Sequence, residues 1–211
     1  DPLVLIQAIT QPGPWSFFFS REGWQSFGVV SFTPWLVLDF WLDWQVAGLR
    51  APLHYLHHLA IIAAIGWVTW LLIRPFIGAG FGALVVALFL WGAPTAVVAQ
   101  QLMSRHYAMG LLLALVSMAC WLRSLRLDPG RPWTAGVAAA TVLFVLAALN
   151  KEVFLPLPLV LFALDSTPLG VRLRRQLPLA IAALAVVAWR SWMLGDLAVF
   201  SQHQRGTGHT D

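Results

Sequence analysis

Long apolar stretches separated by short polar turns make up most of the chain after residue 51. A helix needs about 20 predominantly apolar residues to cross the hydrocarbon core of a bilayer. The runs that suit such helices are 52–73, 76–99, 102–122, 133–149, 153–164 and 177–194. They predict an all-α fold, a polytopic transmembrane helix bundle with about six spans.

The fifth run differs from the others because it is short and contains Pro156 and Pro158. Proline leaves backbone groups without their helical hydrogen bonds, which a membrane helix tolerates where other parts of the protein surround it. We therefore expect residues 153–164 to pack inside the bundle, near a site, and not against lipid.

Composition also indicates an integral membrane protein. Of the 211 residues, 59% are hydrophobic and only 10% are charged, whereas soluble domains contain about 25% charged residues. The mean hydropathy is +0.75 and the pI is about 10.2. The basic residues are mostly arginines scattered between apolar segments, so the high pI does not indicate a nucleic-acid partner. Cys120 is the only cysteine and cannot form an intrachain disulfide.

The basic residues predict which turns face the cytoplasm. If all six runs span, the turns alternate between two sides, and the cytoplasmic set should be richer in Lys and Arg. One set holds seven of the 13 basic residues, namely Arg74, Arg123, Arg126, Arg131, Arg172, Arg174 and Arg175. We expect this set to be cytoplasmic. The turns at 104–106 and 150–152 would then face the opposite compartment.

Three regions follow from this topology. Residues 1–51 are expected to form an extracytoplasmic loop with an amphipathic interfacial helix, 52–195 the bundle, and 196–211 the start of the next extracytoplasmic loop. In "FTPWLVLDFWLDWQVAGL", Asp39 and Asp43 share a helix face among several tryptophans, as in a helix lying at the membrane surface. The two acids are either that helix's polar face or a pair of metal ligands.

Three consecutive polar residues, Asn150, Lys151 and Glu152, interrupt the apolar stretch "LAALNKEVFLPLPLVLFAL". Charges are costly in such surroundings unless they have partners, so they are candidates for function. Glu152 could act as a base or metal ligand, and Lys151 could contact a phosphate. The alternative is that Glu152 stabilises the start of a helix through the helix dipole.

Other polar side chains are expected at the same mouth of the bundle. Arg105, near Gln100 and Gln101, presents a planar donor fork that suits phosphate, unless it only reaches the headgroup level. Arg190 lies in the outer half of the last run and needs an anionic or carbonyl partner. The cluster His54, His57 and His58 has a spacing that permits a metal ion, although contact with a substrate fits interfacial histidines better.

In order along the chain, the segments "LFLWGAPTAVVAQQLMSRHYAMGLLLAL", "ALNKEVFLPLPLVLFALD" and "AWRSWMLG" resemble the GT-C superfamily of polytopic membrane glycosyltransferases. The closest branch is the protein O-mannosyltransferase-like group with the tetratricopeptide-associated membrane proteins. The matching motifs are Pro94 to Arg105, then Asn150-Lys151-Glu152 with Pro156 and Asp165, then Arg190 with Leu194-Gly195. Gln100 and Gln101 stand where family members often carry an acid.

The resemblance implies transfer of a sugar from a polyprenyl-phosphate donor to a protein, lipid or glycan hydroxyl, with inversion, outside the cytoplasm of a bacterial inner membrane. Arg105, Lys151 and Arg190 would bind the donor phosphate, and His54, His57, Gln100 and Asn150 would contact substrate. Asp1 would be the catalytic base, after an upstream span, with Glu152 as the second candidate. No metal ligands are assigned, although a divalent ion is possible as a cofactor.

Two other classes of protein fit the same pattern. A transporter or flippase could line a substrate path with these charges, although transporters usually carry them near the midplane of the membrane. A membrane assembly subunit without catalysis would not depend on a lipid-linked sugar.

Overall fold

The computed structural model describes residue 13 and residues 15–26 and 32–195, and every regular element in these parts is a helix. The all-α fold class is therefore confirmed. Asp1, the candidate base, and residues 196–211 lie outside the described residues. The elements are α2 (Ser16–Phe19), α3 (Arg21–Ser26), α4 (Pro34–Ala47), α5 (Ala51–Ile77), α6 (Ala79–Trp91), α7 (Ala93–Gln100), η1 (Leu102–Ser104), α8 (Arg105–Leu127), α9 (Ala135–Asn150), η2 (Glu152–Phe154), α10 (Leu157–Leu164) and α11 (Leu169–Leu194).

All six predicted apolar runs are helical, but six spans are not confirmed. Three helices are long and apolar enough to cross a membrane: α5, the stretch from η1 through α8, and α11. Helices α6 and α7 pass the same test only as a pair, bent by 57°. Helix α9 is about 24 Å long, less than the hydrocarbon thickness of about 30 Å. The described residues thus contain three candidate spans, or four with the bent pair.

The flanks of the long helices need a lipid environment. Only 22% to 33% of the apolar window of each spanning helix is buried inside the protein. Large apolar side chains point outward along these helices, among them Trp67, Leu71 and Leu184, of which Leu184 is 71% exposed. Apolar surface of this extent on a monomer indicates contact with a membrane. The chain is an integral membrane protein.

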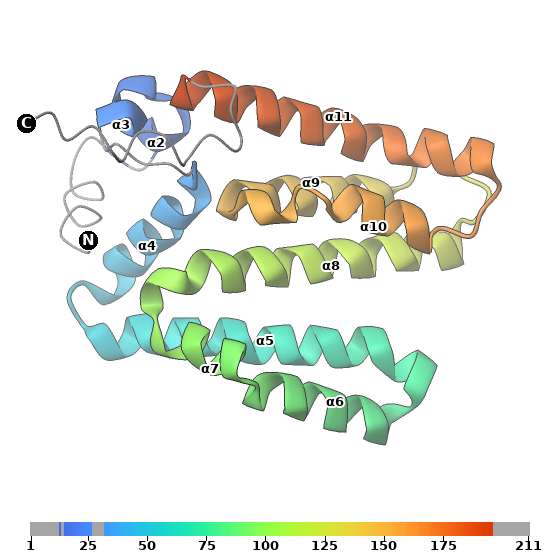
Figure 1. Cartoon of the computed structure of the whole chain (residues 1–211), viewed down its shortest axis with the longest axis horizontal. Coiled ribbons are helices and arrows are strands. Elements are labelled where there is room, and N and C mark those ends of the chain that lie inside the picture. Colours follow the sequence, from blue (N-terminus) through green and yellow to red (C-terminus); the bar gives the residue numbers. More distant parts are fainter. Residues whose placement is uncertain (1–12, 14, 27–31, 196–211) are drawn as a thin grey trace, which may run out of the picture.

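Successive long helices run in opposite directions (Figure 1). The turn after α5, the loop between α8 and α9, and the turn between α10 and α11 lie at one end of the bundle. We call this the arginine end, because the seven clustered arginines are carried there. The starts of α5 and α8, the turn between α9 and η2, and the end of α11 lie at the opposite end, which we call the site end. The two sets of turns are therefore separated along the bundle.

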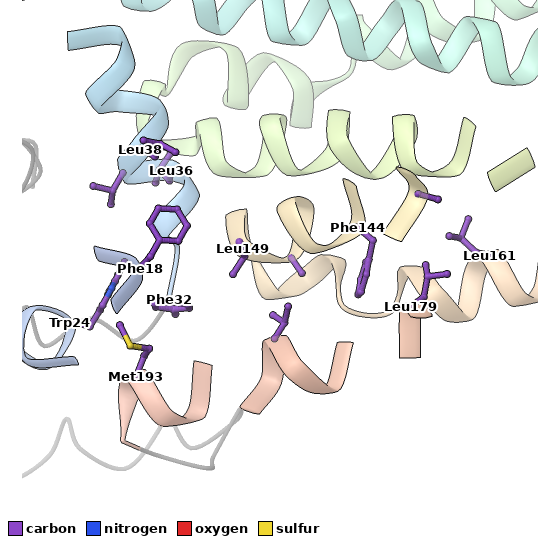
Figure 2. Packing of buried hydrophobic residues seen from close by; sticks show 14 of the residues in the cluster. Phe18, Trp24, Phe32, Leu36, Leu38, Phe144, Leu149, Leu161, Leu179 and Met193 are labelled. Atoms are coloured by element: carbon purple, nitrogen blue, oxygen red, sulfur yellow. The ribbon is translucent and has the colours of Figure 1, made fainter. Parts of the chain in front are cut away.

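Helix α4 differs from the predicted surface helix. Its first half is buried, including Leu36, Val37 and Leu38, and these side chains join a cluster with Phe18 and Trp24 near the end of α9 (Figure 2). Asp39 is only 7% exposed, so it does not belong to a solvated polar face. The sequence prediction was wrong at this acid because its buried partner, described below, is 66 residues away.

The contact between α8 and α9 is made by small residues. Gly136 lies so close to α8 that an added Cβ would come within 2.9 Å of the Ser124 side chain. The Ser117 hydroxyl donates to the carbonyl of Ala140 at 2.7 Å, and both residues are fully buried. Small side chains and hydroxyl donors are what let membrane helices approach closely. Helix α9 is consequently held in the interior although it is short.

A buried ion pair holds the arginine end together. Arg175, at the start of α11, is fully buried, and its Nη1 donates to Asp165 at 3.2 Å. Its Nη2 donates to three carbonyls of the loop after α8, those of Asp128, Pro129 and Arg131, at 2.8 to 3.1 Å. One guanidinium thus joins the ends of α8, α10 and α11.

We expect Arg175→Gln to destabilise the protein by about 3 kcal/mol or more, because Asp165 would remain buried without its counter-charge. The neighbouring Arg174 is exposed, so Arg174→Gln should change stability by less than about 0.5 kcal/mol. Reaction of Cys120 with a thiol-reactive dye during heating in detergent would measure unfolding. Equal melting temperatures for the two variants would contradict the importance of the buried pair.

Candidate functional site

Polar side chains from five segments gather at the site end. They come from α4, the start of α5, the start of α8, the turn between α9 and η2, and the end of α11 (Figure 1). They form two groups with different charge balance. One group surrounds Arg105 and the other surrounds Glu152.

Arg105 is the centre of the first group and is fully buried. Its Nη1 donates to Asp39 Oδ2 at 3.1 Å and also to Asp43 Oδ2. Its Nη2 donates to the carbonyl of His54 at 2.7 Å, and its Cζ lies 4.5 Å from the ring centre of Phe40. Arg105 therefore connects α4 and α5 to the first residue of α8.

These bonds bear on the predicted contact between Arg105 and a donor phosphate. Both terminal nitrogens of the guanidinium are already used by protein oxygens, and no part of the side chain is exposed. A phosphate would have to displace Asp39 or Asp43 to reach it. The phosphate role of Arg105 stays a prediction, and in the present geometry the residue positions α4 against α8.

Asp39 and Asp43 were considered in the sequence only as a polar face or a metal pair, and their pairing with Arg105 was missed. Burial raises the pKa of Asp39 above its usual value, and the nearby Arg105 guanidinium only partly offsets this effect. The available signal was two acids four residues apart in α4 and an arginine, Arg105, at the start of a later apolar run. Sequence alone did not show that the two would meet.

The histidines at the start of α5 are anchored separately. His57 Nδ1 donates to Asp43 Oδ1 at 2.6 Å, and the His57 side chain is 38% exposed. A neutral His57 held in this way carries its proton on Nδ1 and leaves Nε2 as an acceptor. His54 donates from Nε2 to the carbonyl of Gly48 at 2.9 Å. His58 is fully buried and donates to the carbonyl of Val98 at 2.8 Å.

The second group is centred on Glu152. Its Oε1 lies 3.4 Å from Lys151 Nζ and 3.9 Å from Arg190 Nη2. Two cations thus approach one carboxylate, and Arg190 makes a further interaction as well. The structure brings together three predicted site residues, one of them 38 positions further along the chain.

Several neighbours complete this group. Lys151 Nζ lies 5.8 Å from the ring centre of Tyr107 on α8. Asn150 is fully buried; its Nδ2 donates to the carbonyl of Leu146 at 2.9 Å, while its Oδ1 has no hydrogen-bond partner among the described residues. Gln100 is exposed at the end of α7. Because Asn150 is fully buried, its contact with a substrate stays a prediction.

The position of Glu152 depends on how closely η2 packs against α8. The ring of Phe154 in η2 lies directly against Gly110 of α8, where an added Cβ would overlap the ring. Glycine at this position lets η2 approach α8, and Glu152 is therefore carried to the level of the first turn of α8. This glycine was not recognised from the sequence.

No three His, Cys, Asp or Glu side chains within the described residues are placed to hold a metal ion together. Asp43, His54 and His57 are close to one another, but their ring and carboxylate atoms are bonded to each other, to Arg105 and to Gly48. The geometry thus assigns no ligands to the divalent ion that the sequence analysis considered.

Comparisons of the chain with protein-family models, with curated proteins and with solved structures find no match. The resemblance to membrane glycosyltransferases therefore rests on the sequence motifs alone.

The two acids bound to Arg105 should differ in their response to neutralisation. Asp43→Asn removes the carboxylate charge next to the buried Arg105 guanidinium, and we expect a loss of about 3 kcal/mol. Asp39→Asn should cost about 1 kcal/mol or less, because burial already favours the neutral form of this acid. Thermal unfolding followed through Cys120 labelling would compare them.

The pH dependence gives a second check on Asp39. Because its pKa is raised in the folded protein, Asp39 stabilises the fold at low pH, and that contribution is lost as the pH rises above the usual Asp value. The stability of Asp39→Asn should therefore increase relative to that of the wild type as the pH rises. A larger loss for Asp39→Asn than for Asp43→Asn at neutral pH would contradict this assignment.

Proposed function

We propose that this protein is a membrane glycosyltransferase that moves a sugar from a polyprenyl-phosphate donor to a hydroxyl of a protein, lipid or glycan. The reaction would take place at the site end, on the extracytoplasmic side of a bacterial inner membrane. The observation that carries the proposal is the convergence of Lys151 and Arg190 on Glu152 at the site end.

A phosphate site at this place suits a lipid-linked donor. The helices that supply Arg190 and Tyr107 belong to candidate membrane spans, so a polyprenyl chain in the bilayer would bring its phosphate to the level of their ends. An arginine fork and a lysine provide donors for phosphate oxygens. Glu152 attracts both cations and would keep them near each other, where both can reach the phosphate.

In the proposed reaction the acceptor oxygen attacks the anomeric carbon of the sugar. The bond between that carbon and the phosphate oxygen breaks, and polyprenyl phosphate leaves with both electrons of the bond. Lys151 and Arg190 would stabilise the charge that develops on the leaving phosphate. A base takes the proton of the acceptor hydroxyl, and direct displacement inverts the anomeric centre.

The base has three candidates. Asp1 was favoured by the resemblance and lies outside the described residues, so its role stays a prediction. Glu152 is held between two cations, which suits a positioning role better than proton removal. His57 is a new candidate, because Asp43 fixes its ring and its Nε2 remains an acceptor at a partly exposed position.

We expect Lys151→Gln and Arg190→Gln each to lower the rate of sugar transfer about 100-fold, since each removes one stabilising group from the leaving phosphate. The assay uses the complete protein in membrane vesicles with radiolabelled polyprenyl-phosphate sugars. Arg174→Gln, an exposed arginine at the opposite end, is the matched control and should keep wild-type rates.

Two results would oppose the proposal. Full transfer activity in both Lys151→Gln and Arg190→Gln would remove this cluster from the reaction. A wild-type protein that binds polyprenyl phosphate but transfers no sugar would favour a transporter, and one that does neither would favour an assembly subunit.

A further inference from the structure

A groove at the arginine end is unrelated to the candidate site. It lies between the last turns of α5 and α8 and has a volume of about 410 Å³. This size falls within the range of about 300 to 1,000 Å³ typical of pockets for small molecules. Its walls include Leu71, Leu72 and Pro75 from α5 and Leu122, Arg123 and Arg126 from α8.

The two arginines of this groove carry charge that the described residues do not neutralise. Arg123 and Arg126 are three positions apart in α8, so they lie on one face, and both are exposed. Neither forms an ion pair with any residue in the described ranges. The nearby acid, Asp128, lies 3.9 Å from a different arginine, Arg131. The groove therefore has a net positive charge.

The rest of the groove is suited to hydrocarbon. Leu71 and Leu72 from α5 and Leu122 from α8 line it, and Leu71 remains 36% exposed. Pro75 lies inside α5 and lacks an N–H group, so the carbonyl of Leu71 loses its usual helical donor. The groove thus offers apolar walls and one backbone acceptor next to two guanidinium groups.

The groove lies near the level at which the membrane surface is expected. Both of its helices are candidate spans, and the groove lies where they end, at the level expected for lipid headgroups. Clusters of basic residues at the ends of membrane helices bind the anionic headgroups of the cytoplasmic leaflet. An arginine pair with bidentate donors matches the phosphate of such a lipid.

We propose that this groove is a binding site for one anionic phospholipid. Arg123 and Arg126 bind the headgroup phosphate, and an acyl chain follows Leu71, Leu72 and Leu122 along the bundle. The site lies at the opposite end from Lys151 and Glu152, so it does not depend on the proposed transferase activity.

The test measures lipid binding to the complete protein purified in detergent. Phosphatidylglycerol and phosphatidylcholine with the same acyl chains are added separately, and both the melting temperature and lipid adducts in native mass spectrometry are recorded. We expect phosphatidylglycerol to raise the melting temperature and to remain bound, with phosphatidylcholine clearly weaker. Each arginine near a membrane surface strengthens the binding of anionic lipid about fivefold, so Arg123→Gln/Arg126→Gln should weaken phosphatidylglycerol binding about 25-fold.

Control variants distinguish lipid binding in this groove from general attraction between anionic lipid and a basic protein surface. Arg174→Gln removes an exposed arginine from the same end and should leave phosphatidylglycerol binding unchanged. The single variants Arg123→Gln and Arg126→Gln should each show about a fivefold loss, which keeps the test possible if the double variant is poorly stable. Equal binding of both lipids, an unchanged affinity in the arginine variants, or an equal effect of inorganic phosphate would each overturn the proposal. Protection of the groove by a second copy of the chain, seen as dimers that exclude lipid, would overturn it as well.

Discussion

A charged side chain between apolar helices must either have a buried counter-charge or lie where the helices end, and this constraint shapes the whole protein. Arg105 and Arg175 are both fully buried, and each donates to at least one carboxylate and at least one backbone carbonyl. The first turns of α8 and α11, which carry or adjoin these residues, lie at opposite ends of the bundle (Figure 1). Each arginine connects three helical segments, so the charges that are difficult to bury also fix how the ends are assembled.

The same constraint distinguishes charged side chains that hold helices together from those that could bind a ligand. Around Arg105 the acids Asp39 and Asp43 use the terminal guanidinium nitrogens. Around Glu152, by contrast, two cations, Lys151 and Arg190, approach one carboxylate. Asp39 and Asp43 would oppose an anionic substrate at the first group, so the second group is the one that we propose for it. This difference, and not the number of polar residues, is why the proposed phosphate site is placed at Lys151 and Arg190.

The sequence predicted the helices well because apolar runs and polar turns are local signals. The all-α class and the grouping of arginines at one end follow from them. Six spans are not confirmed, because the length of α9 and the bend at Gly92 depend on packing. The pairing of Asp39 with Arg105 and the contact of Phe154 with Gly110 could not be predicted, since each joins segments that are far apart in the sequence.

The separation of the two ends by the membrane is tested most directly by thiol labelling in intact cells. In a Cys120→Ser background, Met103→Cys places an exposed thiol at the site end and Gly130→Cys places one at the arginine end. We expect a membrane-impermeant maleimide to label position 103 from outside, and position 130 only after the cells are made permeable. Labelling of both positions from the same side would contradict a bundle whose two ends face different compartments.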